Sequence, residues 1–234
     1  MPYAENKTNR KLAAIYSGGK DGHLSLLMAM SAGSSISCLI TIDGGKDHSH
    51  FFHDLRKTEI IRIHAEKMDI PLVICKLVPG MRQGKAGTAD MLAYLAETAA
   101  KEYSFDALCC GATDGDDDGN AESFRKSGIA AGIMVETPLA GLNASDILRR
   151  QENAGVRAII VAAERGKLPE SLLGMETGSR FASMLEKLNK KGNYDDGNDF
   201  QTIVTDSPLF PSPIEIKKRE IIRDMERSYL KITV

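Results

Sequence analysis

Short apolar runs alternate with longer amphipathic stretches over the first half of the chain. The apolar runs predict buried strands at 11–16, 37–42, 71–75, 107–111 and 134–136. The stretches between them have helical periodicity and predict helices at 23–32, 55–68, 88–103 and 121–131. Because strands that alternate with helices along a chain usually lie parallel, this order predicts an α/β fold with a doubly wound, Rossmann-like parallel sheet.

The pattern changes after Pro138. A helix at 144–154, an apolar strand at 158–162 and a helix near 178–188 are followed by a charged stretch, 190–197, that is rich in Gly and Asn and predicts a linker. Alternating residues then predict strands at 200–205 and 214–222, with 229–234 as a hairpin partner. We therefore predict an N-terminal domain over 11–136 and a smaller C-terminal α/β domain over 137–234.

A glycine-rich loop, Ser17 to Gly22, lies between the first predicted strand and the first predicted helix. Adjacent glycines let the backbone pass close to a ligand, and the first helical turn offers N–H groups that suit phosphate. Lys20 adds a positive charge, and Asp21 can hold Mg²⁺ on the same phosphates. The loop matches neither the Walker A pattern nor the Gly-x-Gly-x-x-Gly fingerprint. The alternative is a tight strand-to-helix turn without a ligand.

Ligands of doubly wound sheets collect at the C-terminal ends of the strands. The glycine loop, the polar loop 43–53 and the acidic run Asp114–Asp118 all follow predicted strands, so we expect them at one edge of the sheet. Our predicted nucleotide-binding set therefore contains the loop residues together with Ile42, His53 and Gly111.

The string Ser17-Gly18-Gly19-Lys20-Asp21 resembles the PP-loop of the N-type ATP pyrophosphatases. This resemblance implies a fold of the adenine nucleotide alpha hydrolase type, with ATP and Mg²⁺ as cofactors. It also implies cleavage of ATP to AMP and pyrophosphate during adenylation of a substrate. The family usually has Ser where this chain has Gly22, so one possible phosphate contact is missing.

Three further stretches are similar to the diphthine–ammonia ligase family within these pyrophosphatases. They are Ser49–His53, Leu168–Gly174, and Asp196–Thr202 with Asp206–Phe210 after it. Two glutamates of the family's last motif are the shorter aspartates Asp196 and Asp199 here. The family's Ser-x-Tyr-Gln-Arg stretch after the fourth strand is replaced by the acidic segment Asp114–Asn120.

The resemblance implies an ATP-dependent carboxylate–ammonia ligase. A substrate carboxylate would attack the α-phosphorus of ATP, and ammonia would then attack the acyl-adenylate. By resemblance, the substrate is the diphthine side chain of translation elongation factor 2. The residues Ser17, Gly18, Gly19 and Lys20 would hold the leaving pyrophosphate, and Asp21 would hold Mg²⁺. Asp196 and Asp199 would bind or deprotonate the amine donor, ammonium.

Two other functions fit the same residues. One is a PP-loop enzyme that adenylates tRNA or a small molecule, and the other is a non-catalytic adenine-nucleotide sensor. Net charge is −2 and no Cys-x-x-Cys pair occurs, which argues against a nucleic-acid partner and against tRNA thiolation. Cysteines within apolar runs, no signal peptide and no membrane-spanning run predict a cytoplasmic protein with no membrane partner.

Two stretches have the residue types of metal sites. Asp114, Asp116, Asp118 and Gly119 match the first half of an EF-hand loop, but Arg125 stands where the bidentate Glu belongs, which favours a solvated turn or an acidic loop beside the nucleotide. His48, His50 and His53 with Asp47 have zinc-ligand character, and the alternative is a polar loop over the nucleotide. His64 is predicted to pack within its helix or to face solvent.

Overall fold

The computed structural model describes residues 9–43, 58–76, 87–114, 120–189, 199–223, 225 and 227–234. The chain divides into two compact units. The first contains the described residues up to Ser17 and from Asp21 to Gly141, and the second contains Leu142–Val234. By its contacts, the short segment Gly18–Lys20 belongs to the second unit. We keep as a prediction that residues 11–136 and 137–234 form separate domains.

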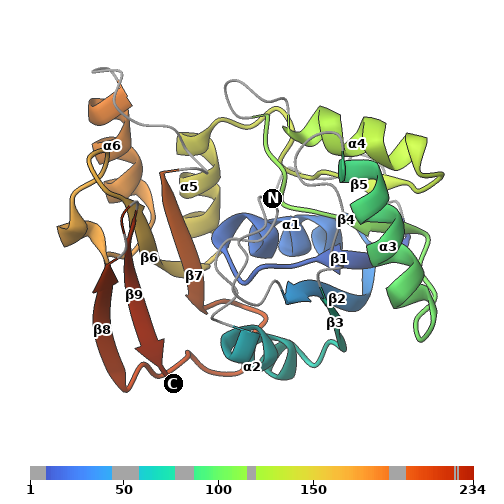
Figure 1. Cartoon of the computed structure of the whole chain (residues 1–234), viewed down its shortest axis with the longest axis horizontal. Helices are drawn as coiled ribbons and strands as arrows, with labels where there is room; N and C mark the ends of the chain where they lie inside the picture. Colours follow the sequence, from blue (N-terminus) through green and yellow to red (C-terminus); the bar gives the residue numbers. More distant parts are fainter. Residues whose placement is uncertain are drawn as a thin grey trace. The chain divides into compact units, whose positions relative to one another are not determined.

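The first unit is built on a five-stranded parallel sheet with the strand order β3-β2-β1-β4-β5 (Figure 1). Its strands are β1 (Lys11–Ile15), β2 (Ser35–Asp43), β3 (Leu72–Lys76), β4 (Ala107–Cys109) and β5 (Val135–Glu136). The chain runs outward from β1 to β3 and then returns to the centre, where β4 pairs with β1. This arrangement confirms the predicted doubly wound sheet, and its switch point lies between β1 and β4.

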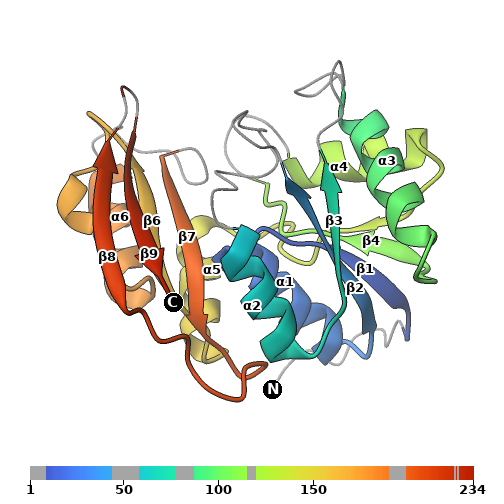
Figure 2. The ribbon, with the colours of Figure 1, turned by 60° about the horizontal axis from the view of Figure 1, so that its bottom comes forward.

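Helices cover both faces of this sheet, as Figure 2 shows, with α1 and α2 on one face and α3 and α4 on the other. Their bounds are α1 (Lys20–Ser31), α2 (Thr58–Met68), α3 (Thr88–Ala100) and α4 (Asn120–Ala130). Right-handed crossovers place helices in this way when the strand order reverses direction. Because both faces are covered, the strands are nearly continuous apolar runs, and Cys38, Ile40 and Leu108 are fully buried.

The second unit has a four-stranded antiparallel sheet in the order β7-β6-β9-β8. Its strands are β6 (Arg157–Glu164), β7 (Phe200–Asp206), β8 (Lys218–Arg223) and β9 (Arg227–Thr233). The helices α5 (Ala144–Asn153) and α6 (Ser179–Asn189), with the short 3₁₀ helix η2 (Glu170–Leu172), complete it. Side chains from α5, α6, β6 and β7 form one apolar core.

Several predicted boundaries differ from the structure by a few residues. The first helix begins at Lys20 rather than His23, so the lysine of the glycine loop is its first residue. β8 begins at Lys218 rather than Ile214, and the Ile214 N–H donates to the Thr205 carbonyl of β7 at 2.7 Å instead of to β9. No described helix combines the length and the apolar character needed to cross a membrane.

Candidate active site

The loop after β1 has the geometry of an anion site. β1 continues its parallel pairing as far as Tyr16, whose N–H donates to the Ile40 carbonyl at 2.8 Å. Gly18 then takes a φ of 79°, in the left-handed region that favours glycine. Because α1 begins at Lys20, both Lys20 and Asp21 lie in the first helical turn, whose N–H groups lack partners within the helix. The helix end therefore favours an anion.

Gly111, the second residue after β4, lies against this loop. A Cβ atom on Gly111 would lie 2.5 Å from the Gly22 nitrogen and 2.6 Å from the Asp21 carbonyl carbon, so only glycine fits. At Gly22 a Cβ atom would meet the Tyr16 ring at 3.6 Å, an ordinary contact. The structure thus places the predicted residue Gly111 at the β1/β4 switch point, in backbone contact with the start of α1.

The buried hydroxyl group of Tyr16 lies within hydrogen-bond distance of two buried imidazole rings. The Tyr16 hydroxyl lies 2.9 Å from Nδ1 of His23 and 2.7 Å from Nδ1 of His64. The hydroxyl can donate to one imidazole and accept from the other. Burial lowers the pKa of His23 to about 4 and raises the pKa of Tyr16. His64 is buried, which agrees with one of its two predicted environments. No sequence pattern predicted its contact with Tyr16.

The segment Gly18–Lys20 contacts β7 within the second unit. The Lys20 N–H donates to the Thr202 hydroxyl at 3.1 Å, and the Val204 N–H donates to the Gly18 carbonyl at 2.9 Å. The Lys20 side chain is only 3% exposed, and its ammonium nitrogen lies 5.4 Å from the centroid of the Phe200 ring. Sequence reasoning missed Phe200 and Thr202 as loop contacts, although both lie in the quoted C-terminal motif.

Asp199, immediately before β7, is fully buried and forms an ion pair. Its Oδ1 lies 2.8 Å from the ammonium nitrogen of Lys167, which also lies 3.3 Å from a Glu164 oxygen. The hydrogen bond to Asp199 is the main cause that raises the pKa of Lys167. The Asp199 carbonyl also accepts from the Glu164 N–H at 2.8 Å. This carboxylate is therefore held in a site that accepts an ammonium group.

Other predicted residues lie elsewhere. The Ile42 side chain is fully buried in the core of the first unit, so only its backbone could face a ligand. Asp114 accepts a hydrogen bond from the Gly141 N–H at 2.5 Å, which links two distant segments of the first unit. The residues His53 and Asp196, the zinc candidates Asp47, His48 and His50, and the remaining EF-hand positions Asp116, Asp118 and Gly119 lie outside the described part of the chain.

Asp21, the residue predicted to hold Mg²⁺, lies in the described part of the chain. Within the described ranges, no group of three or more His, Cys, Asp or Glu side chains could hold a metal ion. Mg²⁺ does not need such a group, because one or two carboxylates together with substrate phosphates are enough to bind it. Asp21 in the first turn of α1 fits that requirement.

The motif Leu168–Gly174 has a structural explanation. Glu170 of η2 accepts two hydrogen bonds from Arg223, both at 2.6 Å, and a third from the Ser228 hydroxyl at 3.0 Å. These bonds lower the pKa of Glu170 and tie η2 to the β8–β9 hairpin. Gly174 has a φ of 82°, where a side chain would also crowd Arg219.

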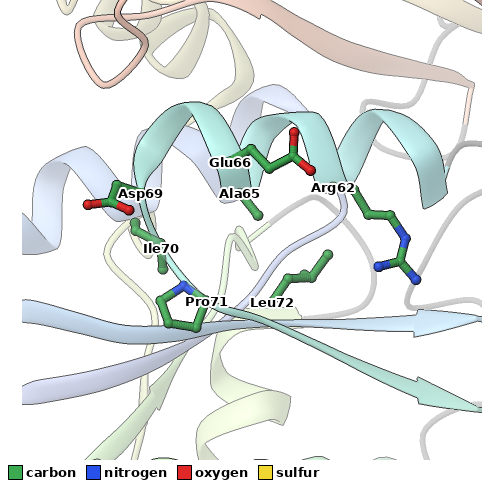
Figure 3. A pocket seen from close by; sticks show the side chains of 7 residues that line it. All are labelled: Arg62, Ala65, Glu66, Asp69, Ile70, Pro71 and Leu72. Atoms are coloured by element: carbon green, nitrogen blue, oxygen red, sulfur yellow. The ribbon is translucent and has the colours of Figure 1, made fainter.

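A surface pocket of about 380 Å³ lies between the end of α2 and the start of β3 (Figure 3). Its lining residues are Arg62, Ala65, Glu66, Asp69, Ile70, Pro71 and Leu72. Because β3 begins here, the pocket is at the N-terminal edge of the parallel sheet. The glycine loop follows the C-terminal end of β1, so the pocket is no part of the candidate site.

Comparison with protein families gives two matches in chain order. Residues 10–117 match the diphthamide synthase N-terminal domain, and residues 143–234 match the diphthamide synthase C-terminal domain. A bovine protein named diphthine–ammonia ligase is 23% identical over 91% of this chain and 85% of its own length. The human protein of that name is 22% identical over the same shares.

A relative of the same name from Schizosaccharomyces pombe is 22% identical over 95% of this chain, but the match covers 39% of that longer protein. Among solved structures, the U34-tRNA thiolase NcsA from Methanococcus maripaludis, determined with its [4Fe-4S] cluster, is similar at a TM-score of 0.42 and 14% identity. That match covers 80% of this chain and 68% of the thiolase.

Proposed function

This chain belongs to the diphthamide synthase family and is a ligase, and we propose that it amidates diphthine to diphthamide on translation elongation factor 2. The proposed co-substrates are ATP and ammonium, and the proposed products are AMP and pyrophosphate. The identity to the named ligases is 22–23%, so the support for this reaction comes from this chain's own residues.

One observation carries the proposal: the glycine loop lies at the switch point of the parallel sheet. The Gly111 backbone lies against Asp21 and Gly22 with no room for a Cβ atom, and β1 and β4 are neighbours. Ligands of doubly wound sheets bind at this crevice, and a helix N-terminus there binds phosphate. A mere strand-to-helix turn does not need a second strand end in backbone contact.

The first step would be adenylation. A carboxylate oxygen of the substrate forms a bond to the α-phosphorus of ATP, and the bond from that phosphorus to the pyrophosphate oxygen breaks. The loop amides from Ser17 to Gly19 and the ammonium group of Lys20 would hold the departing pyrophosphate and neutralise its charge. Asp21 would hold Mg²⁺, which supplies further neutralisation when bound.

The second step would be attack by ammonia on the acyl-adenylate, which forms the C–N bond and releases AMP. Asp199 is our proposed residue for the amine donor, with Asp196 as its partner from outside the described residues. The Lys167 ammonium that Asp199 binds at 2.8 Å is the same kind of cation as an ammonium ion. Because the Lys167 side chain is 45% exposed, it can leave the carboxylate to a competing cation.

The test is incubation of the protein with ATP, ammonium and elongation factor 2 that bears diphthine, with mass spectrometry of the factor. Amidation that requires all three components is expected. AMP formation with some other acceptor would make the chain an adenylating enzyme of different specificity. ATP binding without turnover on any acceptor would make it a nucleotide sensor.

We also propose a cytoplasmic location. The cysteines Cys38, Cys75, Cys109 and Cys110 are free and buried, which suits a reducing compartment. Burial raises the pKa of Cys38 to about 11 and that of Cys110 to about 12, so these thiols are unreactive. Their place is in the core, and we assign them no part in the reaction.

A further inference from the structure

The glycine loop continues the outer edge of β7. Among the described strands of the second unit, β7 stands at the end of the sheet order, next to β6, and is therefore an edge strand. Alternate residues of this strand, Phe200, Thr202 and Val204, provide the contacts with Gly18 and Lys20. The Val204 N–H donates to the carbonyl of Gly18 at 2.9 Å, so the loop lies beside this strand.

Thr202 fixes the first residue of α1. The Lys20 N–H is one of the helix amides that have no partner within the helix, and the Thr202 hydroxyl accepts from it at 3.1 Å. This contact does the work of a helix cap, but it comes from a residue far away in the sequence. In the described part of the chain the hydroxyl has no other partner, so its O–H remains available to donate.

Phe200 acts on the charged end of the same residue. Its ring lies 5.4 Å from the Lys20 ammonium nitrogen, within the range of a cation–π contact. The ring is itself fixed, since it packs edge-on against Phe181 with centroids 5.1 Å apart and is 4% exposed. The two ends of Lys20, its amide and its ammonium group, are therefore both set by β7.

We propose that Thr202, supported by Phe200, is a positioning residue for the phosphate loop and serves the adenylation step. The inference rests on the proposed function, because it assumes that the loop binds ATP. Under this inference, two residues of the C-terminal motif have different roles: Asp199 binds the amine donor, and Thr202 positions the loop that binds the nucleotide. Thr202 acts through Lys20, and the reacting atoms are contacted by the loop.

The experiment compares Thr202→Val, which removes only the hydroxyl, with Thr202→Ser, which keeps it. Thr205→Val is the matched control, because Thr205 lies on the same strand and its hydroxyl donates to the Arg157 carbonyl instead. ATP affinity is measured by calorimetry, and pyrophosphate release is measured separately from amide formation. The loss of one hydrogen bond predicts roughly three- to tenfold weaker ATP binding in Thr202→Val.

Recovery in Thr202→Ser and wild-type affinity in Thr205→Val complete the expected result. A purely structural role would instead lower the melting temperature in Thr202→Val and leave its ATP affinity unchanged once folded. Wild-type ATP affinity in a folded Thr202→Val would overturn the inference while leaving the proposed function intact. Absence of ATP binding by the wild-type chain would overturn the proposed function itself.

A second measurement needs no variant. Hydrogen exchange of the Lys20 amide in the wild-type chain, followed by nuclear magnetic resonance, should be slow without nucleotide because the Thr202 hydroxyl accepts from it. Exchange as fast as that of an exposed loop amide would contradict the contact on which the inference depends. This measurement tests the contact even if Thr202→Val does not fold.

Discussion

The fully buried carboxylate of Asp199 binds the exposed ammonium group of Lys167 at 2.8 Å, one residue before β7 begins. If this carboxylate receives the amine donor, Asp199→Asn should leave pyrophosphate release intact and lower amide formation roughly 10- to 100-fold, the weight of a charged hydrogen bond. The two products are measured separately in one reaction. Equal loss of both would mean that Asp199 only anchors the turn before Phe200, and no loss of either would remove it from the site.

The second prediction concerns Lys167, the partner of Asp199 in this ion pair. Lys167→Met frees Asp199 from its competing cation and keeps most of the side-chain volume. The expected result is a lower KM for ammonium with an unchanged KM for ATP. A rise in the ammonium KM would show that Lys167 helps to hold the donor rather than competing with it.

Lys20 is the only full positive charge of the glycine loop. Lys20→Ala should weaken ATP binding roughly 10- to 100-fold, since a charged hydrogen bond to phosphate is lost. Calorimetric titration with ATP measures the change, and Lys11→Ala on the exposed start of β1 is the control. Unchanged affinity in Lys20→Ala would contradict the assignment of the loop to phosphate.

Two glycines of the site should respond in opposite ways. Gly111→Ala would place a Cβ atom 2.5 Å from the Gly22 nitrogen, so it should displace α1 and abolish ATP binding. Gly22→Ser introduces the hydroxyl of the PP-loops that this loop resembles, and its Cβ atom meets nothing closer than the Tyr16 ring at 3.6 Å. We expect Gly22→Ser to fold normally and to bind ATP at least as tightly as the wild-type chain, as titration and thermal unfolding would show.

The buried histidine beneath the loop predicts a pH dependence of stability. The pKa of His23 is about 4 in the folded chain and about 6.5 in an unfolded one, so the unfolded state binds more protons between these values. Stability should therefore fall as the pH drops below 6.5, by about 2 kcal/mol at pH 5 from this group alone. Urea unfolding at several pH values tests this, and a flatter profile is expected for His23→Gln.

The sequence allowed the parallel sheet and its order of elements to be predicted because buried strands and amphipathic helices differ in periodicity. It also allowed Gly111 to be placed near the loop, since both follow strands of one sheet. It could not reveal that Thr202 caps α1, because that contact joins residues with no shared local pattern. The sharing of one hydroxyl by Tyr16, His23 and His64 depends on packing, which no spacing in the sequence records.

The sequence motifs predicted where residues lie better than they predicted what those residues do. Glu170 stands in a motif shared with a ligase family, yet its partners are Arg223 and Ser228, which makes it a clamp for the β8–β9 hairpin. Ile42 lies one residue before the end of β2, near the predicted edge, yet its side chain is in the core. A position near a strand end therefore predicts that a residue lies near the site. Whether that residue contacts a ligand or packs in the core depends on the direction of its side chain.

The most direct test of the proposed chemistry follows one oxygen atom. If the diphthine carboxylate carries a heavy-oxygen label, adenylation forms a bond between that oxygen and the α-phosphorus, and amide formation leaves it on the AMP. Mass spectrometry of the nucleotide products should therefore find one labelled oxygen in AMP for each amide formed, with unlabelled pyrophosphate. Label in inorganic phosphate, with ADP as the nucleotide product, would show attack at the γ-phosphorus and contradict the account.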